Sequence, residues 1–307
     1  MEDYPRTLME FESRFSSEEA CVEYLRKMRW PGGFVCPSCD GRKAWKTGRL
    51  LLHCADCGHQ VSVTAGTAFQ GTRKPIQMWF RAMWWITSQK NGASAKNLQQ
   101  NLGLGSYQTA WAWLHKLRRA MVRPGRDRLS GLVEVDETYV GGREAVPGRA
   151  AEDKALVVIG VEKKGRALGR TRMAVVSDAS RDQLCGFVQA SVEPGTTVRT
   201  DGWQGYRALK NCGYVHDRIL QQHSSKEPSE LLPGVHRIAS LLKRWLLGTH
   251  QGSVSSAHLP YYLDEFTFRF NRRKSKARGK LFYRLVEQAV AIDPAPYKTL
   301  IRPDHNI

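Results

Sequence analysis

Four of the seven cysteines form two close pairs, Cys36-x2-Cys39 and Cys54-x2-Cys57, with fourteen residues between the pairs. Two such turns supply four thiolates, the ligand set of a closed tetrahedral zinc site. The alternative is two reduced pairs or a redox pair, but the surrounding short hairpins would then fold without the ~10 kcal/mol that zinc ligation contributes. We therefore expect a structural Zn²⁺ ion whose four positions are all filled by protein.

Two aspartates form a second pattern. Asp136 lies in an alternating segment typical of a strand, where Glu134 and Asp136 share one face, and Asp201 ends another short strand. An isolated acid on a strand is usually a solvated side chain. In the strand order predicted below, however, the two strands are neighbours, so both carboxylates lie at one end of the sheet. Two carboxylates suit Mg²⁺ or Mn²⁺, and two such ions can drive phosphodiester cleavage.

The elements that position these aspartates follow from hydrophobic periodicity. The pattern predicts strands over 132–139, 155–161, 171–177, 197–201 and 214–220, and helices near 182–190, 206–211, 235–247, 259–272 and 282–291. Three consecutive strands continued by alternating helices and strands predict a mixed sheet covered by helices. We expect a ribonuclease-H-like mixed α/β domain over residues 131–292, with a tail over 293–307.

Residues 72–123 are helical and basic. Between Thr72 and Arg128 there are eleven Lys or Arg residues and one acid. A Gly-containing break before Ser106, a favourable N-cap, and a helix over 107–121 follow the helix-turn-helix pattern. The tryptophans at helical spacing are interpreted as core. We expect DNA contacts from residues that can reach base edges or phosphates, namely Gln108, Thr109, Lys116, Arg118 and Arg119.

Composition is consistent with a multidomain α+β protein. The 307 residues have a net charge of +18, which favours a nucleic-acid partner, and 41% are apolar, which argues against disorder. No apolar stretch is long enough for a membrane span, and the first residues do not resemble a signal sequence. We expect a helical lead-in (1–30), a zinc ribbon (31–71), a helix-turn-helix-like segment (72–123), a linker (124–130), then the catalytic domain and tail.

Several motifs together resemble insertion-sequence transposases of the DDE type, in particular the group of insertion sequence fifteen ninety-five. The resemblance rests on the cysteine ribbon and on the stretches at 135–142, 200–203, 242–249 and 262–273. It implies metal-dependent DNA cleavage at transposon ends and strand transfer into target DNA, with Asp136 and Asp201 as the first two ligands of the Mg²⁺ or Mn²⁺ ions. Bringing two transposon ends together implies at least a homodimer on double-stranded DNA.

The third metal ligand departs from that family pattern. Similar transposases place Glu or Asn seven residues before a lysine, and here Lys243 minus seven is His236. A neutral imidazole is a softer ligand than carboxylate and favours Mn²⁺ over Mg²⁺. The alternative is that His236 only caps or packs, with Glu227 and Glu230 as the nearest substitutes.

Basic residues of the C-terminal half complete the expected DNA contacts. Lys243 is a phosphate contact by the same resemblance, and six of the ten residues at 271–280 are basic. The set is Lys243, Arg244, Arg272 and Arg273.

Two other functions stay open on the sequence alone. One is a non-catalytic, sequence-specific DNA-binding regulator or an inactive transposase derivative, which His236 in place of an acid keeps open. The other is a junction resolvase on the same fold. For the transposase we expect a bacterial, cytoplasmic and nucleoid-associated protein.

Overall fold

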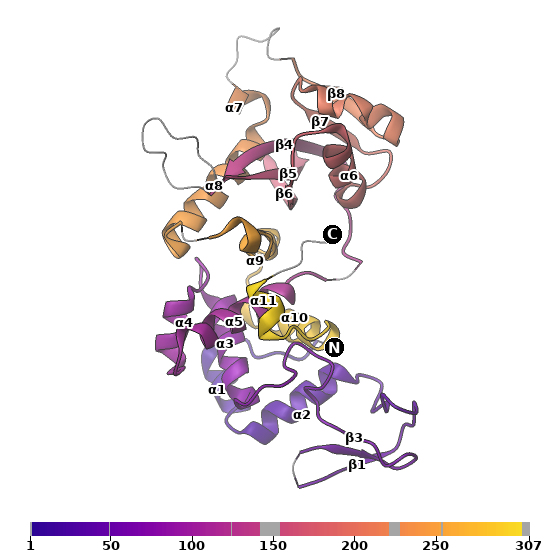
Figure 1. Cartoon of the computed structure of the whole chain (residues 1–307), viewed down its shortest axis with the longest axis vertical. Helices are drawn as coiled ribbons and strands as arrows, with labels where there is room; N and C mark the ends of the chain where they lie inside the picture. The colour runs from indigo at the N-terminus through magenta and orange to yellow at the C-terminus, as the bar shows by residue number, and fades with distance from the viewer. Residues whose placement is uncertain are drawn as a thin grey trace. The chain divides into compact units, whose positions relative to one another are not determined.

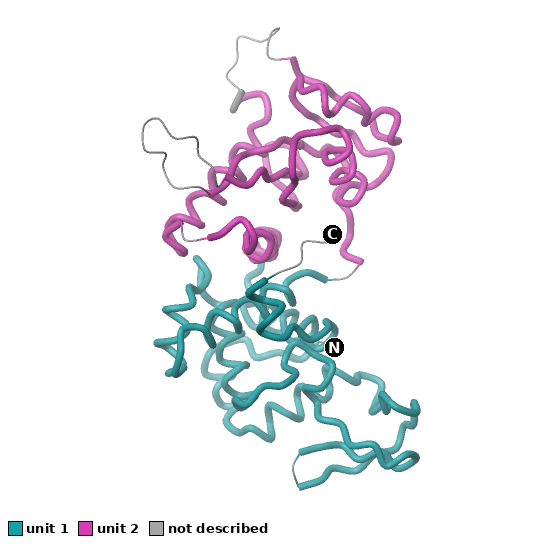
Figure 2. The backbone as a smooth tube through the Cα atoms, viewed as in Figure 1, with its two compact units in different colours: residues 1–123, 275–307 teal, residues 124–274 magenta. Residues whose placement is uncertain are grey.

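The structure, a computed structural model, describes residues 2–48, 50–123, 125–141, 154–220, 228–252 and 254–302. The chain divides into two compact units (Figure 2). Unit 1 comprises residues 1–123 and 275–307, and unit 2 comprises residues 124–274. This division differs from the expected catalytic domain over 131–292, because the last part of that range belongs to unit 1. Within the described ranges, every helix is too short or too polar to span a bilayer.

Unit 1 has a helical core made largely of aromatic side chains, and Figure 1 shows its helices. Its helices are α1 (Leu8–Arg14), α2 (Glu18–Arg29), α3 (Ile76–Ser88), α4 (Ala95–Leu102), α5 (Tyr107–Arg119), α10 (Arg278–Ala291) and α11 (Tyr297–Ile301). Phe282 on α10 lies against Phe11 and Phe80, with ring centroids 5.3 and 5.4 Å apart. The predicted lead-in is thus part of the core, and a helix from the far end of the chain completes it.

The expected tail is also part of unit 1. Leu300 on α11 is fully buried and clusters with Ala112 of α5 and Ala295. The prediction that 293–307 is only a tail is therefore wrong for its described part, because apolar side chains there are removed from water by α5.

Residues 72–123 have the predicted order of a helix, a Gly-containing turn and a second helix. Helix α4 ends at Gly103, whose φ of 61° is left-handed, and α5 begins after Ser106, whose hydroxyl accepts a hydrogen bond from the Thr109 N–H at 3.1 Å. Trp79 of α3 stacks on Trp113 of α5 with centroids 3.7 Å apart. Of the four tryptophans predicted to lie in the core, Trp79 and Trp84 are buried, whereas Trp85 and Trp111 are half-buried; Trp113 is buried as well.

The remaining part of unit 1 is a small antiparallel sheet in the order β1-β2-β3. Its strands are β1 (Ala44–Lys46), β2 (Leu52–Cys54) and β3 (Gln60–Val61). These strands are too short to bury a core, so the cysteine turns that flank them must stabilise the ribbon.

Unit 2 is built on a five-stranded mixed sheet with the order β6-β5-β4-β7-β8. Its elements are β4 (Leu132–Val140), β5 (Ala155–Lys164), β6 (Ala167–Val176), α6 (Arg181–Ser191), β7 (Thr197–Thr200), the 3₁₀ helix η1 (Gln204–Cys212), β8 (Val215–Arg218), α7 (Pro228–Leu231), α8 (Pro233–His250), η3 (Ser256–His258) and α9 (Leu259–Asn271). The first three strands pair antiparallel, while β4–β7 and β7–β8 are parallel. This is the ribonuclease-H-like topology expected from the order of elements; the segment near 206–211 is a 3₁₀ helix.

Helices cover both faces of this sheet. Val133 and Val135 of β4 face the core formed with α6 and η1, whereas Val157 and Ile159 of β5 face the core formed with α8 and α9. Residues 155–161 of β5 carry no charged or polar side chain and show no alternation, because both faces of the strand are buried there. At Gly160 an added Cβ would lie 3.3 Å from Leu129 and 3.5 Å from Phe187, so the glycine lets α6 approach the sheet closely.

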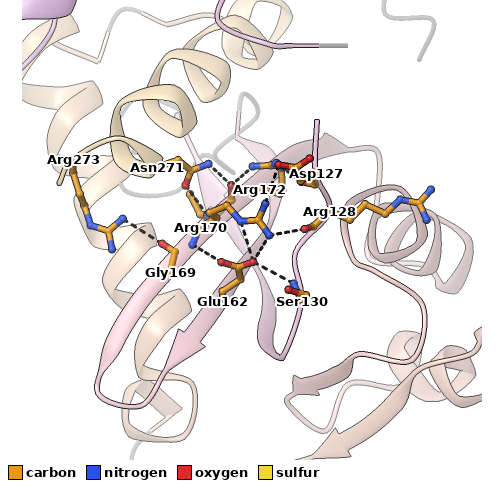
Figure 3. A network of polar contacts seen from close by, with 10 residues as sticks. Asp127, Arg128, Ser130, Glu162, Gly169, Arg170, Arg172, Asn271 and Arg273 are labelled. Carbon is orange, nitrogen blue, oxygen red and sulfur yellow. Dashed lines mark hydrogen bonds and ion pairs between the residues drawn. The ribbon is translucent and has the colours of Figure 1, made fainter. Parts of the chain in front are cut away.

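A polar network holds residues 127–130, the segment that leads into unit 2, to the β5–β6 hairpin (Figure 3). The buried carboxylate of Glu162 accepts hydrogen bonds from the Ser130 and Arg170 N–H groups and from the Arg170 side chain. Arg170 and Arg172 in turn donate to the carbonyls of Arg128 and Asp127. The segment predicted as a linker is therefore anchored to the sheet over residues 127–130.

Candidate active site and zinc site

The four cysteines converge as the sequence predicted. Their sulfur atoms all lie within 4.8 Å of one another, with Cys36 Sγ–Cys57 Sγ at 3.6 Å and Cys39 Sγ–Cys54 Sγ at 3.7 Å. A tetrahedron with Zn–S bonds of about 2.3 Å separates its sulfurs by about 3.8 Å, so the donor set fits Zn²⁺. The cysteine cluster is therefore a metal-binding site of structural type.

Both cysteine turns have the same local design. In each, the residue after the second cysteine has a left-handed backbone, with φ of 59° at Asp40 and 72° at Gly58. Backbone hydrogen bonds close the turns, from Asp40 N–H to the Cys36 carbonyl and from Gly58 N–H to the Cys54 carbonyl. The Cys36 thiol has its pKa lowered to about 7, since backbone N–H groups and neighbouring thiols outweigh its desolvation. A thiolate at neutral pH is what zinc ligation requires.

The parallel pairing of β4 and β7 decides where the two aspartates lie. The register pairs Leu132 with Thr197 and Glu134 with Arg199, an offset of 197 − 132 = 65 residues. Asp136 and Asp201 are also 201 − 136 = 65 residues apart, so continuing the register sets them side by side. Asp201 stands one residue beyond the end of β7, at the carboxyl edge of the strand pair.

Three carboxyl groups influence one another at this edge. Burial, together with the charges of Glu137 and Asp201, raises the pKa of Asp136 to about 7. Burial also raises the pKa of Glu137, and Asp201 adds to that effect while a hydrogen bond opposes it. Desolvation and repulsion both oppose three bare negative charges here. A divalent cation relieves that repulsion, so the donor set fits Mg²⁺ or Mn²⁺.

Glu137 was not among the predicted site residues. Its carboxylate accepts a hydrogen bond of 2.6 Å from the hydroxyl of Tyr206 on η1, and Tyr206 is fully buried. Burial and the Glu137 charge raise the pKa of Tyr206 well above its ordinary value, so the hydroxyl stays a donor. The motif Val-Asp-Glu-Thr had placed Glu137 beside Asp136, but strand alternation turns its side chain to the opposite face. Only the packing of η1 shows its partner.

Asp201 is held in a local turn. One of its carboxylate oxygens, Oδ1, accepts the Trp203 N–H at 2.9 Å, while the Trp203 indole donates to the Ala179 carbonyl at 2.9 Å. An added Cβ at Gly205 would lie 2.8 Å from that carbonyl oxygen. The Thr-Asp-Gly-Trp stretch thus positions Asp201 through backbone geometry, which leaves its other oxygen for a ligand.

His236 approaches the aspartates from the first turns of α8. Its Nε2 lies 3.7 Å from Asp136 Oδ2, and its side chain is 38% exposed. Lys243 and Arg244, two turns further along α8, are exposed, and so is Glu230; Glu227 and Gly142 lie outside the described residues. Among the described residues only the cysteines form a set of three or more ligand atoms within 4.8 Å of one another. Asp136, Asp201 and His236 therefore do not form a set of that closeness in the described part of the chain.

The residues of α5 that were predicted to contact DNA differ in how far their side chains are exposed to solvent. Gln108 is exposed, and Thr109 and Lys116 are half-buried. Burial lowers the pKa of Lys116, with a further contribution from the Arg119 charge. Arg119 donates to the Asp293 carbonyl at 3.3 Å. Arg118 is 1% exposed, so a DNA contact through it would require its guanidinium to leave this buried position.

The two predicted DNA contacts after α9 use their guanidinium groups within unit 2. Arg273 donates to the Gly169 carbonyl (Figure 3). It also donates to the Leu168 carbonyl and lies over the Phe270 ring, 3.8 Å from its centroid. Arg272 lies over the Phe268 ring at 4.1 Å and is half-buried. A DNA contact through Arg273 would share donors that already hold the β5–β6 hairpin.

Comparison with known proteins agrees with this arrangement. Residues 128–271 match the family described as the ISXO2-like transposase domain, and residues 16–60 match the transposase zinc-ribbon domain. The uncharacterized protein in transposable element ISH50 of Halobacterium salinarum is 27% identical over 281 residues, covering 83% of this chain and 91% of that protein.

Two solved structures are similar at a lower level. The catalytic core domain of BIV integrase has a TM-score of 0.33 and 16% identity, over 48% of this chain and 86% of that one. The simian T-cell lymphotropic virus intasome in complex with the PP2A regulatory subunit B56 gamma has a TM-score of 0.33 and 12% identity, over 62% of this chain and 74% of that one.

The strand order of unit 2 and the cysteine ribbon define a ribonuclease-H-like fold joined to a zinc-ribbon domain. The chain belongs to the IS1595-type transposases.

Proposed function

We propose that this transposase binds the terminal repeats of its own insertion sequence, cleaves them to a free 3′-hydroxyl and joins that end to target DNA. The observation that carries the proposal is the parallel β4–β7 register, whose offset of 65 residues equals the separation of Asp136 and Asp201. Raised pKa values at Asp136 and Glu137 support it, because a site with such repulsion favours a bound cation.

In this proposal Asp136, Asp201 and His236 hold Mg²⁺ or Mn²⁺. Two bound ions would activate the attacking hydroxyl and stabilise the leaving oxygen. Asp136 and Asp201 orient their carboxylates from adjacent strands, and Glu137, held by Tyr206, adds negative charge beside them. His236 would supply its Nε2 atom, which lies 3.7 Å from Asp136 Oδ2. Lys243, exposed on the same helix, would contact a phosphate of the bound end.

The rest of the chain would bind and position DNA. Gln108 and Thr109 at the start of α5 would approach base edges, and basic residues of α5, α8 and the segment after α9 would neutralise phosphates. The ribbon would hold Zn²⁺ structurally. Handling two transposon ends calls for a homodimer or larger assembly on DNA, and the protein would work in the bacterial cytoplasm at the nucleoid.

The test is cleavage and joining of duplex DNA that carries the terminal sequences flanking the coding region, with Mg²⁺ or Mn²⁺ added. Asp136→Asn and Asp201→Asn should each lower the cleavage rate at least about 10³-fold, because each removes a negative ligand from the ions, while DNA affinity stays within about 2-fold. The matched control is Asp182→Asn, an exposed aspartate of α6, which should cleave like wild type.

Three results would contradict the proposal in different ways. Unchanged cleavage in Asp136→Asn would remove the aspartate pair from the reaction. Specific binding with no cleavage by the wild type would indicate a regulator or an inactive derivative. Cleavage of branched DNA without joining would indicate a junction resolvase.

A further inference from the structure

Glu134 is a buried carboxylate that links the central strand to the helix carrying His236. It lies on β4, two residues before Asp136 and on the same face, and is 1% exposed. One of its oxygens, Oε2, accepts the Gly234 N–H at 2.7 Å and the Val235 N–H at 3.2 Å. These N–H groups belong to the first turn of α8, where a helix has no internal acceptors for them. The carboxylate therefore caps α8 from the sheet.

Gly234 is the residue that allows this approach. A Cβ added there would lie 2.5 Å from Glu134 Oε2 and 3.2 Å from its Cδ. Pro233 precedes it at the first helical position, where the missing N–H removes one donor that would otherwise need a partner. The Pro-Gly pair thus shapes the start of α8 around the carboxylate, and any larger residue at 234 would push the helix away from β4.

The second oxygen of Glu134 is paired by charge alone. Lys163 Nζ of β5 lies 3.5 Å from Oε1, and that oxygen has no hydrogen-bond partner among the described residues. The positive end of the α8 dipole and the lysine together offset the buried charge. The contact to α8 is therefore the strongest directed interaction that Glu134 makes.

The contact between Glu134 and Gly234 affects how α8 lies against β4 near Asp136. Asp136 follows Glu134 by two residues on β4, and His236 follows Gly234 by two residues on α8. The Glu134–Gly234 contact and the approach of His236 Nε2 to Asp136 at 3.7 Å are thus successive contacts between the same strand and the same helix. We propose that Glu134 is a positioning residue whose carboxylate clamps α8 to β4 and so sets the approach of His236 to Asp136. The inference rests on the proposed role of these two residues in holding a divalent cation.

The first test measures Mn²⁺ binding to the full-length, zinc-loaded protein by the loss of the free-Mn²⁺ electron paramagnetic resonance signal. Glu134→Ala should weaken Mn²⁺ binding about 10-fold or more, since loss of an outer-shell partner costs about 10–100-fold in metal affinity. Glu134→Gln, which keeps one acceptor oxygen, should recover most of that loss. Gly234→Ala, which leaves the carboxylate in place, should weaken binding like Glu134→Ala.

Glu162→Gln is the matched control. Glu162 is equally buried and accepts backbone N–H groups, but it holds the Ser130 and Arg170 segments and not α8. It should leave Mn²⁺ affinity within about 2-fold of wild type even where it lowers thermal stability. A folding defect alone would therefore appear in both variants, whereas the positioning role appears only in the variants at 134 and 234.

The second test asks whether Glu134 acts through His236. In a His236→Ala background, Glu134→Ala should cause little further loss of Mn²⁺ affinity. Equal losses with and without His236, or wild-type affinity in folded Glu134→Ala, would overturn the proposal. If Glu134→Ala does not fold, the same two comparisons are made with Gly234→Ala. Failure of the proposed function is distinct, because the wild type itself would then bind no Mn²⁺ at this site.

Discussion

Asp136 is the residue at which the local energetics of the site are most visible. Its side chain is 15% exposed, and burial with the charges of Glu137 and Asp201 raises its pKa to about 7. Without a cation, ionising this group works against folding, since the unfolded chain ionises it near the ordinary value of 3.8. Ionised Asp136 thus lowers the stability of the folded protein in the metal-free state.

The pH dependence of stability tests this directly. Because the folded pKa is raised, the stability contributed by protonated Asp136 is complete below about pH 4 and is lost as pH rises to about 7. In protein free of Mg²⁺ and Mn²⁺ but retaining zinc, Asp136→Asn should exceed wild type at pH 8 by at most about 4 kcal/mol, from about 3 units at about 1.36 kcal/mol each. Urea unfolding of both proteins at each pH measures this difference in the free energy of unfolding.

The stability gain of Asp136→Asn over wild type should shrink toward zero at pH 4, where the side chain at position 136 is neutral in both folded proteins. Asp182→Asn, at an exposed position on α6, should show no such trend. Parallel wild-type and Asp136→Asn curves between pH 4 and 8 would mean that Asp136 titrates in the folded protein as it does in the unfolded chain.

At the scale of elements, α10 belongs to a different unit from the one its sequence position suggests. Phe282 contacts Phe11, Phe15, Phe80 and Trp84, all from helices more than 190 residues earlier in the chain. The aromatic rings meet mostly edge to face, a favourable geometry beyond their buried area. The core of unit 1 is therefore closed only after the whole chain has been made.

Phe282→Ala should lower the stability of unit 1 by about 3–5 kcal/mol, since it leaves a cavity in an aromatic core. Hydrogen exchange should accelerate in α2 and α3 and stay unchanged in β4 and β5. Phe266→Ala, a buried phenylalanine of α9 in unit 2, should give the reverse pattern. Faster exchange in both units from either substitution would argue against two separate cores.

At the scale of the whole molecule, charge dominates. Lys and Arg number 47 against 29 Asp and Glu, a net charge of +18. Some of these basic side chains, such as Arg172 and Arg273, also donate hydrogen bonds to backbone carbonyls within the protein. An excess of this size favours a polyanion and adds affinity that does not depend on base sequence. Sequence discrimination must then come from a few exposed polar residues such as Gln108.

The salt dependence of DNA affinity measures this electrostatic contribution to binding. Raising salt from about 50 to about 200 mM should weaken DNA binding about 10³-fold if about six phosphates are neutralised. Lys243→Ala should reduce the slope of log affinity against log salt by about 1, whereas Gln108→Ala should leave the slope unchanged and relax sequence preference. An affinity that changes less than about 10-fold over this range would argue against broad phosphate contact.

The sequence by itself determined the parts whose signals are local or regularly spaced. The cysteine turns, the Ser106 cap and the strand order follow from residue spacing and hydrophobic period, and the structure has each of them. The pairing of Asp136 with Asp201 stays a prediction, which the β4–β7 register supports. Tertiary structure alone decided that α10 joins unit 1, that Arg118 is buried, and that Glu134 and Glu137 meet Gly234 and Tyr206. These contacts join segments 69 or more residues apart, and they depend on which surfaces pack together, which periodicity within one segment does not encode.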